Sequence, residues 1–109
     1  MKTDCIVILV TCPTRAVARR IAAALVTKRL AACVNVLPGI ESTFRWKGKV
    51  DHCREILLII KSTRRLFPAL AHALARLHPY EVPEVIALPV TAGAVPYLRW
   101  VAASVSSSE

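Results

Sequence analysis

The sequence predicts a single α+β domain built as a ferredoxin-like split βαβ sandwich. The chain has 109 residues, which fits one core. Its apolar patterns switch in order between strand and helix periods, and it contains only three glycines, which leaves little room for open loops. We expect residues 1–109 to form one domain, with a core over about residues 3–103 and a frayed tail over residues 104–109.

The first half of the chain predicts a strand, a helix and a long hairpin. Residues 3–11 are almost continuously apolar and β-branched, which is typical of a strand buried on both faces. Pro13 then lies near the expected start of a helix, because apolar side chains recur at helical spacing over residues 18–26. Residues 30–37 predict a strand that Pro38-Gly39 interrupts. The pattern alternates over residues 40–46, and a tight turn at 47–49 leads into a strand over 50–61. Together these segments form a hairpin that is too long for a small domain and would extend beyond it.

The second half predicts a helix, an edge strand and a short final helix. Ser62-Thr63 is the expected helix cap, and leucines repeat at helical spacing up to His78, with an irregular first turn at Pro68. Residues 84–90 predict a strand in which Pro89 suits an edge position. The order is therefore β-α-β-β-α-β plus a short C-terminal helix after Pro96. Two helices then cover one face of an antiparallel sheet, and the other face needs another cover.

Composition favours an oligomer. Apolar residues make up 55% of the chain, against roughly 45–50% in typical soluble domains. Obligate subunit interfaces resemble a domain core cut in half, so an interface is the expected place for the surplus. The net charge of +8 attracts anions, but the arginines are scattered along amphipathic elements and indicate a solvated face.

The sequence also predicts a cytoplasmic protein that does not enter the membrane. The early apolar run over residues 5–10 is far shorter than the roughly 20 residues that cross a bilayer, and no signal-peptide cleavage pattern follows it. The cysteines contain no C-x-x-C pair, which favours a reducing compartment; they are Cys5, Cys12, Cys33 and Cys53.

Motifs along nearly the whole chain resemble the CutA divalent-cation tolerance family in order and spacing. They are TCP at 11–13, LAACVN at 30–35, PGI at 38–40, WKGK at 46–49, IK at 60–61, HPYEVPEVIALP at 78–89 and Tyr97-Leu98-x-Trp100. A lone HPY would mean little, but all of these in register, from about residue 5 to 101, are highly specific.

The resemblance implies a tight homotrimer with the ferredoxin-like fold, in which hairpins extend between subunits. It also implies an architectural kinship with the PII signalling proteins, which bind ligands in clefts between subunits. The family is named for tolerance of divalent cations and is associated with copper binding. No reaction is assigned to it, so we expect a protein that is not an enzyme and has no organic cofactor.

Three side chains are candidate metal ligands: Cys12, His78 and Glu84. His78 and Glu84 bracket a proline-stiffened turn, and imidazole and carboxylate are ligands for Zn²⁺ or Cu²⁺. Cys12 precedes the expected helix, whose dipole would lower the pKa of the thiol, and a thiolate suits Cu⁺. The structural alternatives stay open: His78 bonded to the last helix carbonyls, Glu84 in a salt bridge and Cys12 in the core.

A second set of residues is assigned to a ligand cleft or the trimer interface: Trp46, Lys61, Tyr80, Tyr97 and Trp100. Lys61 ends a buried strand, where it would meet an anion or pair with Glu84. The aromatic side chains are more often packing than ligand contacts, so most belong to the interface.

Three classes of function compete. The first is a trimer for metal tolerance that binds copper or another divalent cation; its alternative is a PII-like signalling protein that binds a small anionic ligand between subunits. The second is an enzyme, which the absence of nucleophile-elbow, P-loop and H-E-x-x-H motifs disfavours. The third is a nucleic-acid binder. Strands 6–10 and 56–60 lack the aromatic residues that stack bases, so no specific nucleic acid is expected, while salt-sensitive association stays open.

Overall fold

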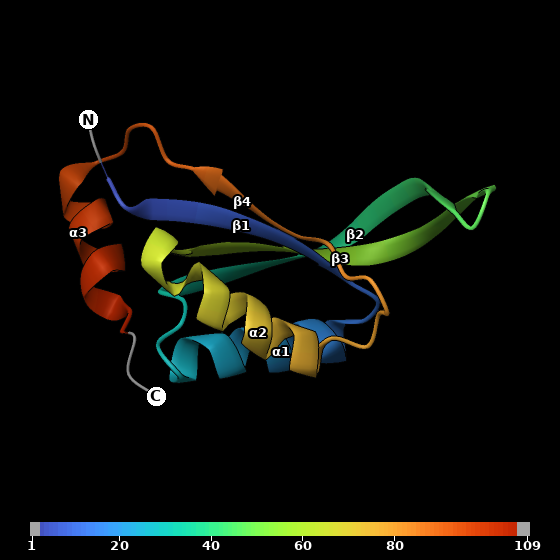
Figure 1. The fold of residues 1–109 in the computed structure, drawn as a ribbon, viewed down its shortest axis with the longest axis horizontal. Coiled ribbons are helices and arrows are strands. Elements are labelled where there is room, and N and C mark those ends of the chain that lie inside the picture. The colour runs from blue at the N-terminus through green and yellow to red at the C-terminus, as the bar shows by residue number, and fades with distance from the viewer. Residues whose placement is uncertain (1–2, 107–109) are drawn as a thin grey trace.

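The computed structural model describes residues 3–106 as one four-stranded antiparallel sheet with helices on one face and at one end (Figure 1). The elements are β1 (Cys5–Cys12), α1 (Arg15–Thr27), β2 (Cys33–Trp46), β3 (Lys49–Thr63), a 3-10 turn η1 (Arg64–Leu66), α2 (Phe67–Leu77), β4 (Val85–Pro89) and α3 (Val95–Ser104). The strand order β2-β3-β1-β4 confirms the ferredoxin-like prediction and places Pro89 on an edge strand. Among residues 3–106, no helix is long and apolar enough to cross a bilayer.

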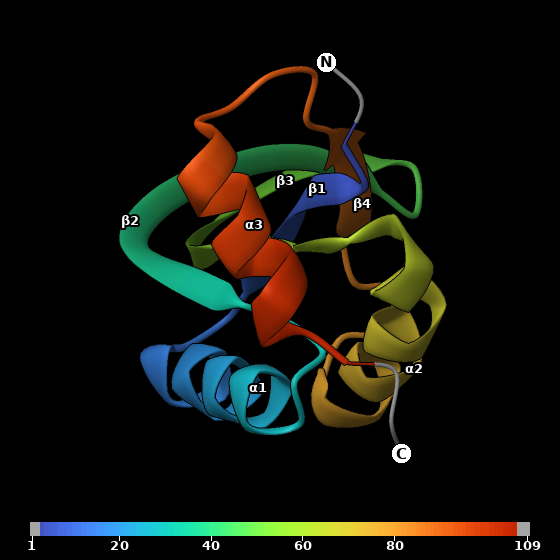
Figure 2. The ribbon, with the colours of Figure 1, turned by 90° about the vertical axis from the view of Figure 1, so that its left-hand side faces the viewer.

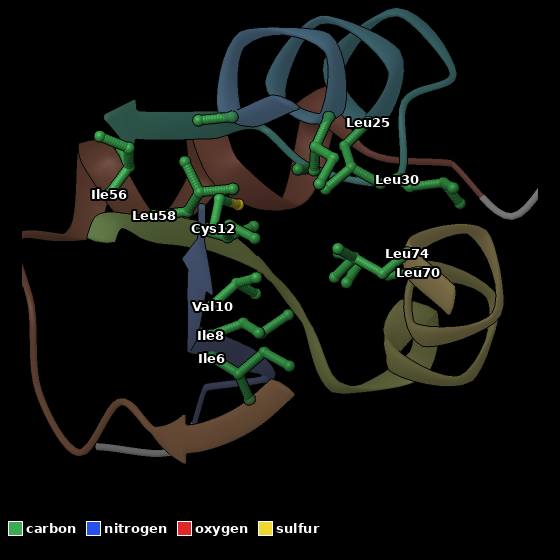
Figure 3. Close-up of a cluster of buried hydrophobic side chains, with 14 residues drawn as sticks. Ile6, Ile8, Val10, Cys12, Leu25, Leu30, Ile56, Leu58, Leu70 and Leu74 are labelled. Atoms are coloured by element: carbon green, nitrogen blue, oxygen red, sulfur yellow. The ribbon is translucent and has the colours of Figure 1, made fainter. Parts of the chain in front are cut away.

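The core lies between the sheet and the pair α1 and α2, which lie side by side beneath it (Figure 2). The side chains of the two central strands that point at the middle of the helical layer are fully enclosed, as Ile8, Val10, Leu58 and Ile60 show with 0% exposure. They meet Leu25 of α1 and the leucines of α2 (Figure 3). This packing follows from amphipathic helices whose apolar stripes face the sheet.

The opposite face of the sheet is open in the single chain. Its central row runs from Leu9 of β1 to Ile59 of β3, and both side chains are partly exposed. Towards the edges, Leu37 is 37% exposed and Ile86 is 49% exposed. The prediction that β1 is buried on both faces is therefore wrong for the isolated chain, because the helices cover one face only.

The β2–β3 hairpin extends well beyond the helices and gives the molecule its longest dimension of 43 Å (Figure 1). Lys47 and Gly48 both have positive φ between the paired residues Trp46 and Lys49, which matches a type I′ turn. The register shifts between Leu37 and Ile40. The predicted interruption at Pro38-Gly39 is thus a bulge inside one strand, tolerated because β2 is an edge strand.

The helix starts differ from prediction in detail. Thr14 caps α1 by accepting a hydrogen bond from the backbone of Val17 at 3.2 Å, so Pro13 lies outside the helix. The predicted cap at Ser62-Thr63 is wrong: Ser62 donates to the Leu30 carbonyl at 2.6 Å, and Thr63 makes no side-chain cap bond. The chain instead enters α2 through η1, which confirms an irregular start next to Pro68.

Helix α3 closes one end of the sandwich (Figure 1). Val101 and Val105 are buried in a second apolar cluster with Cys5, and the Arg29 guanidinium donates to the carbonyls of Ala103 at 2.9 Å and Ser104 at 3.1 Å. The predicted frayed tail is therefore wrong over residues 104–106, because this packing fixes them. Residues 107–109 of that prediction lie outside the described part of the chain.

Candidate functional site

A groove of about 710 Å³ lies where the hairpin leaves the body of the domain and meets the loop after α2. Thr11, at the end of β1, lies at its base. The hairpin and the loop over residues 80–84 supply the other lining residues, which are Ser42, Thr43, Phe44, Trp46, Asp51, Cys53, Glu55, Tyr80, Glu81, Val82 and Glu84. Polar and aromatic side chains therefore converge on one concave surface, which is the usual form of a ligand site.

The groove is acidic in a protein that is basic overall. Its lining includes four carboxylates, Asp51, Glu55, Glu81 and Glu84, and within residues 3–106 it includes no Lys or Arg. The net charge of the whole chain is +8. Charges of one sign in a concave surface concentrate counter-ions, so this groove attracts cations and repels anions.

Glu55 and Tyr80 form the innermost polar pair of the groove. The Tyr80 hydroxyl donates to Oε2 of Glu55 at 2.7 Å, and Glu55 is only 7% exposed. Burial raises the pKa of Tyr80 strongly. The hydrogen bond to Glu55 and the negative charge of Glu55 raise this pKa further. Tyr80 therefore stays protonated and keeps donating to the carboxylate.

His78 supports the groove from behind. Its Nδ1 accepts a hydrogen bond from the backbone of Tyr80 at 3.1 Å, so the ring proton is on Nε2, which donates to the Thr11 carbonyl at 2.7 Å. The ring is 7% exposed and lies 4.7 Å, centroid to centroid, from the Tyr80 ring. Both ring nitrogens are thus engaged in fixing the turn after α2, and neither offers a free lone pair to a metal.

Cys12 is enclosed among the side chains of the main core (Figure 3). Burial, with a smaller effect of the Glu55 charge, raises the pKa of the thiol from 9.0 to about 11. The predicted lowering of this pKa is wrong. Cys12 is the last residue of β1 with 0% exposure, and α1 begins three positions later at Arg15, so desolvation outweighs any effect of the helix dipole.

The structure separates the predicted cleft residues. Trp46, Tyr80 and Glu84 line the groove together. Lys61 instead lies on the open face of the sheet, where its ammonium donates to the Asn35 side chain. Tyr97 and Trp100 contact each other on α3, with ring centroids 5.5 Å apart, at the end of the sandwich away from the hairpin (Figure 1).

Sequence reasoning missed the acidic side chains of the hairpin. Strand alternation placed Ser42 and Trp46 on one side, and in the structure Ser42 pairs with Cys53 across the hairpin. Carrying that alternation across the turn would have put Asp51 and Glu55 on the same side. The contact from Glu55 to Tyr80 joins residues 25 apart and has no local signal.

The three predicted metal ligands do not form one site in the single chain. Among residues 3–106, no group of three or more His, Cys, Asp or Glu side chains is arranged to hold a metal ion. Cys12 lies in the core and His78 has both nitrogens bonded, while Glu84 is exposed in the groove. The oxygen donors of the groove suit a divalent cation that accepts carboxylates and do not suit Cu⁺.

Fold and site together define a class of protein: a ferredoxin-like α+β domain with an overshooting hairpin, an acidic groove at its base and an open apolar sheet face. The CutA1 divalent ion tolerance protein family model matches residues 6–104. The chain belongs to this family.

Relatives from distant organisms are similar over most of the chain. The human protein CutA is 55% identical over 92 residues, which are 84% of this chain and 51% of that protein, so the chain spans about half of its length. The divalent-cation tolerance protein CutA of Thermus thermophilus is 51% identical over 94 residues, 86% of this chain and 91% of the relative. The crystal structure of CutA1 from Oryza sativa superposes with a TM-score of 0.93 at 44% identity, covering 97% of each chain. Relatives from Arabidopsis thaliana and Archaeoglobus fulgidus are named chloroplastic and periplasmic, so membership does not fix a compartment.

Proposed function

We propose that this chain is a non-enzymatic subunit of a trimer for divalent metal ion tolerance, and that it binds copper, as Cu²⁺, or another divalent cation in the acidic groove. The observation that carries the proposal is the gathering of four carboxylates on one groove of a protein with a net charge of +8. Membership of a family named for divalent ion tolerance supports the same reading. The acidic lining argues against the alternative of a PII-like protein that takes a small anionic ligand there.

Glu84 is the ligand that we carry over from the sequence. It is exposed in the groove together with Glu81 and Asp51, and none of these three makes an ion pair within residues 3–106, where the only salt bridge joins Arg54 to Glu41. Because residues 3–106 of one chain gather no three suitable side chains, a metal held by three or more ligands from this part of the protein needs some from a second chain. The metal site and the oligomer are therefore linked in this proposal.

The open face of the sheet supports the trimer. Partly exposed apolar side chains run across all four strands, from Leu37 of β2 through Ile59 and Leu9 to Ile86 of β4. Contiguous apolar surface of this kind marks an interaction site, and it has the character of an obligate interface. Three copies whose sheets pack together would bury this face and leave the helices outside.

Native mass spectrometry with Cu²⁺ and Zn²⁺ titrations tests both parts of the proposal. We expect a trimer that takes up metal in steps of three, and loss of that uptake in Glu84→Gln. Glu41→Gln is the matched control, since Glu41 lies on the same hairpin outside the groove and pairs weakly with Arg54 at 3.9 Å. A trimer that stays bare would refute metal binding, and a monomer at micromolar concentration would refute the assembly.

The lack of an enzymatic role is supported by the state of the two side chains best suited to catalysis. The Cys12 thiol is buried with a raised pKa, so little thiolate exists near neutral pH. His78 has both nitrogens in backbone hydrogen bonds. Iodoacetamide labelling of the folded protein tests this reading: rapid modification of Cys12 at neutral pH would contradict it.

We also propose a cytoplasmic location. All four cysteines are free thiols, and the Cys53 side chain is exposed on the hairpin. An exposed thiol survives most readily in a reducing compartment. Rapid acid quenching of producing cells followed by thiol counting tests this, and a Cys53 disulfide in freshly quenched cells would contradict it.

A further inference from the structure

The helical layer carries a basic surface that the metal proposal does not use. Helices α1 and α2 lie side by side on the outside of the sandwich (Figure 2). Neither helix contains an Asp or Glu, and neither does any residue from 5 to 40 or from 56 to 80. We give the name basic helical face to six exposed cations on these helices or next to their ends; they are Arg15, Arg19, Arg20, Lys28, Arg65 and Arg76.

These cations are unpaired and lie in one layer. Within residues 3–106 the single ion pair is on the hairpin, so no carboxylate neutralises the basic helical face. His78 follows the end of α2 and bonds to Thr11 just before α1, which places Arg76 and Arg15 at the same end of the layer. The lining of the groove, by contrast, holds four carboxylates and no Lys or Arg within residues 3–106, so the groove and the basic helical face differ in charge.

Helix stability does not explain these arginines. Arg15 opens α1, where the helix dipole disfavours a positive charge by about 0.3–1 kcal/mol. Arg15 and Arg19 are four residues apart, so their like charges repel along the helix, at a further cost of about 0.2–0.5 kcal/mol. An arrangement that is locally unfavourable alone becomes favourable when an extended anion lies across it.

We propose that the basic helical face binds the sugar–phosphate backbone of double-stranded nucleic acid, without sequence specificity. Guanidinium groups pair with phosphates through two parallel hydrogen bonds. Helix α1 spans about 20 Å at 1.5 Å per residue, a length over which one strand of duplex DNA presents roughly 6 phosphates. The face therefore matches a regular row of phosphates in both charge and extent.

The composition of the face separates this partner from other polyanions. A helix that binds a membrane surface inserts several large apolar side chains, whereas α1 exposes the small residues Ala16 and Ala23 and a single large apolar residue, Val26. Binding of single strands depends on aromatic side chains that stack bases. The exposed aromatic residues lie instead on the hairpin and on α3: Phe44, Trp46, Tyr97 and Trp100.

Fluorescence anisotropy with a short DNA duplex of random sequence tests the proposal in the presence of a metal chelator. The test variant is Arg15→Gln/Arg19→Gln/Arg20→Gln. The matched control is Arg45→Gln/Lys47→Gln/Lys49→Gln, which removes the same charge from the exposed hairpin. Glutamine keeps helix propensity close to that of arginine, and circular dichroism verifies the fold of both variants.

We expect salt-dependent binding by the unmodified protein and at least about a tenfold loss in the helix variant at low salt, with the slope of log K against log salt reduced by roughly 2–3. The hairpin variant should stay within about threefold of the unmodified protein. Equal losses in both variants, no binding at low salt, or binding to phosphatidylserine vesicles in place of DNA would each overturn the proposal. Because the chelator removes divalent metal from the assay, a failure of the DNA-binding proposal is distinct from a failure of metal binding.

Discussion

The two faces of the sheet are built from similar apolar residues but have different surroundings. Facing the helices, Leu58 and Ile60 of β3 have no exposed surface. On the same strand, Leu57 and Ile59 point the other way and remain partly exposed. Alternation along one strand thus creates one face that the chain covers itself and one that it leaves open.

This difference shows where the surplus of apolar residues is used. Helices α1 and α2 complete a full core on one side without drawing on the open face. The remaining apolar side chains lie in contiguous rows, which is the pattern of an interface and not of scattered surface residues. If the proposed trimer forms through the open face, stability of the subunit and assembly depend on different faces of the same strands.

The largest effect is expected from truncation on the helix-covered face. Leu58→Ala should lower the free energy of unfolding by about 2–5 kcal/mol, because it opens a cavity in a closely packed core. Urea denaturation at fixed protein concentration measures this. Val50→Ala, on the hairpin with 64% exposure, is the control and should change stability by less than about 0.5 kcal/mol. Similar losses of unfolding free energy in both variants would contradict the distinction between covered and open regions.

A charge on the open face sharpens the comparison. Ile59→Asp should weaken association at least about 100-fold, or roughly 2.7 kcal/mol, because an unpaired charge would enter the interface. The far-ultraviolet circular dichroism of the subunit should stay unchanged. Light scattering with size-exclusion chromatography measures the assembly, and Ile59→Val is the conservative control. Unfolding without dissociation would show that this face belongs to the core of the subunit.

The groove extends the comparison to a buried polar contact. Tyr80→Phe removes the donor to Glu55 and should cost about 1–2 kcal/mol of stability, because the carboxylate stays mostly enclosed without that partner. Thermal or urea unfolding measures the loss. Tyr97→Phe is the matched control on α3, where the ring packs on Trp100 and makes no side-chain hydrogen bond to a carboxylate among the described residues. Equal effects of the two changes would argue against the Tyr80–Glu55 contact.

A further effect, similar in size to that of Tyr80→Phe, concerns pH. The folded state raises the pKa of Cys12 from 9.0 to about 11, so folding favours the protonated thiol. Its contribution to stability is complete below pH 9 and is lost as the pH rises towards 11, by at most about 1.4 kcal/mol per pH unit. Unfolding free energies at pH 8.5 and 10.5 should fall further in the unmodified protein than in Cys12→Ala. The same decline in both proteins would contradict the assignment to Cys12. Tyr80, whose pKa is also raised by folding, is present in both proteins and cannot produce a difference of this kind.

Much of the fold was predictable because local patterns agree with the final topology. Strand and helix periods gave the element order, and Pro89 indicated an edge strand. The errors came from interactions between distant parts of the chain. Ser62 bonds to Leu30 instead of capping a helix, and residues 104–106 are fixed by Arg29 and the second apolar cluster.

The candidate site was predictable only in part for the same reason. Trp46, Tyr80 and Glu84 were selected by motif and do share the groove. Residue type suggested Cys12 as a reactive thiol, but its reactivity depends on burial, which the sequence around it does not reveal. Glu55 was missed because its partner Tyr80 comes from a separate element.

The overshooting hairpin has a consequence for how assembly can be observed. Residues 41–46 pair only with residues 49–54, and in the single chain the side chains on both strands are mostly exposed. Isolated two-stranded ribbons open readily, so their amide protons exchange with solvent far sooner than those of a packed sheet. If neighbouring subunits pack against the hairpin, its amide protons exchange slowly. Deuterium uptake over residues 41–54 at several protein concentrations would then report assembly without any mutation or label.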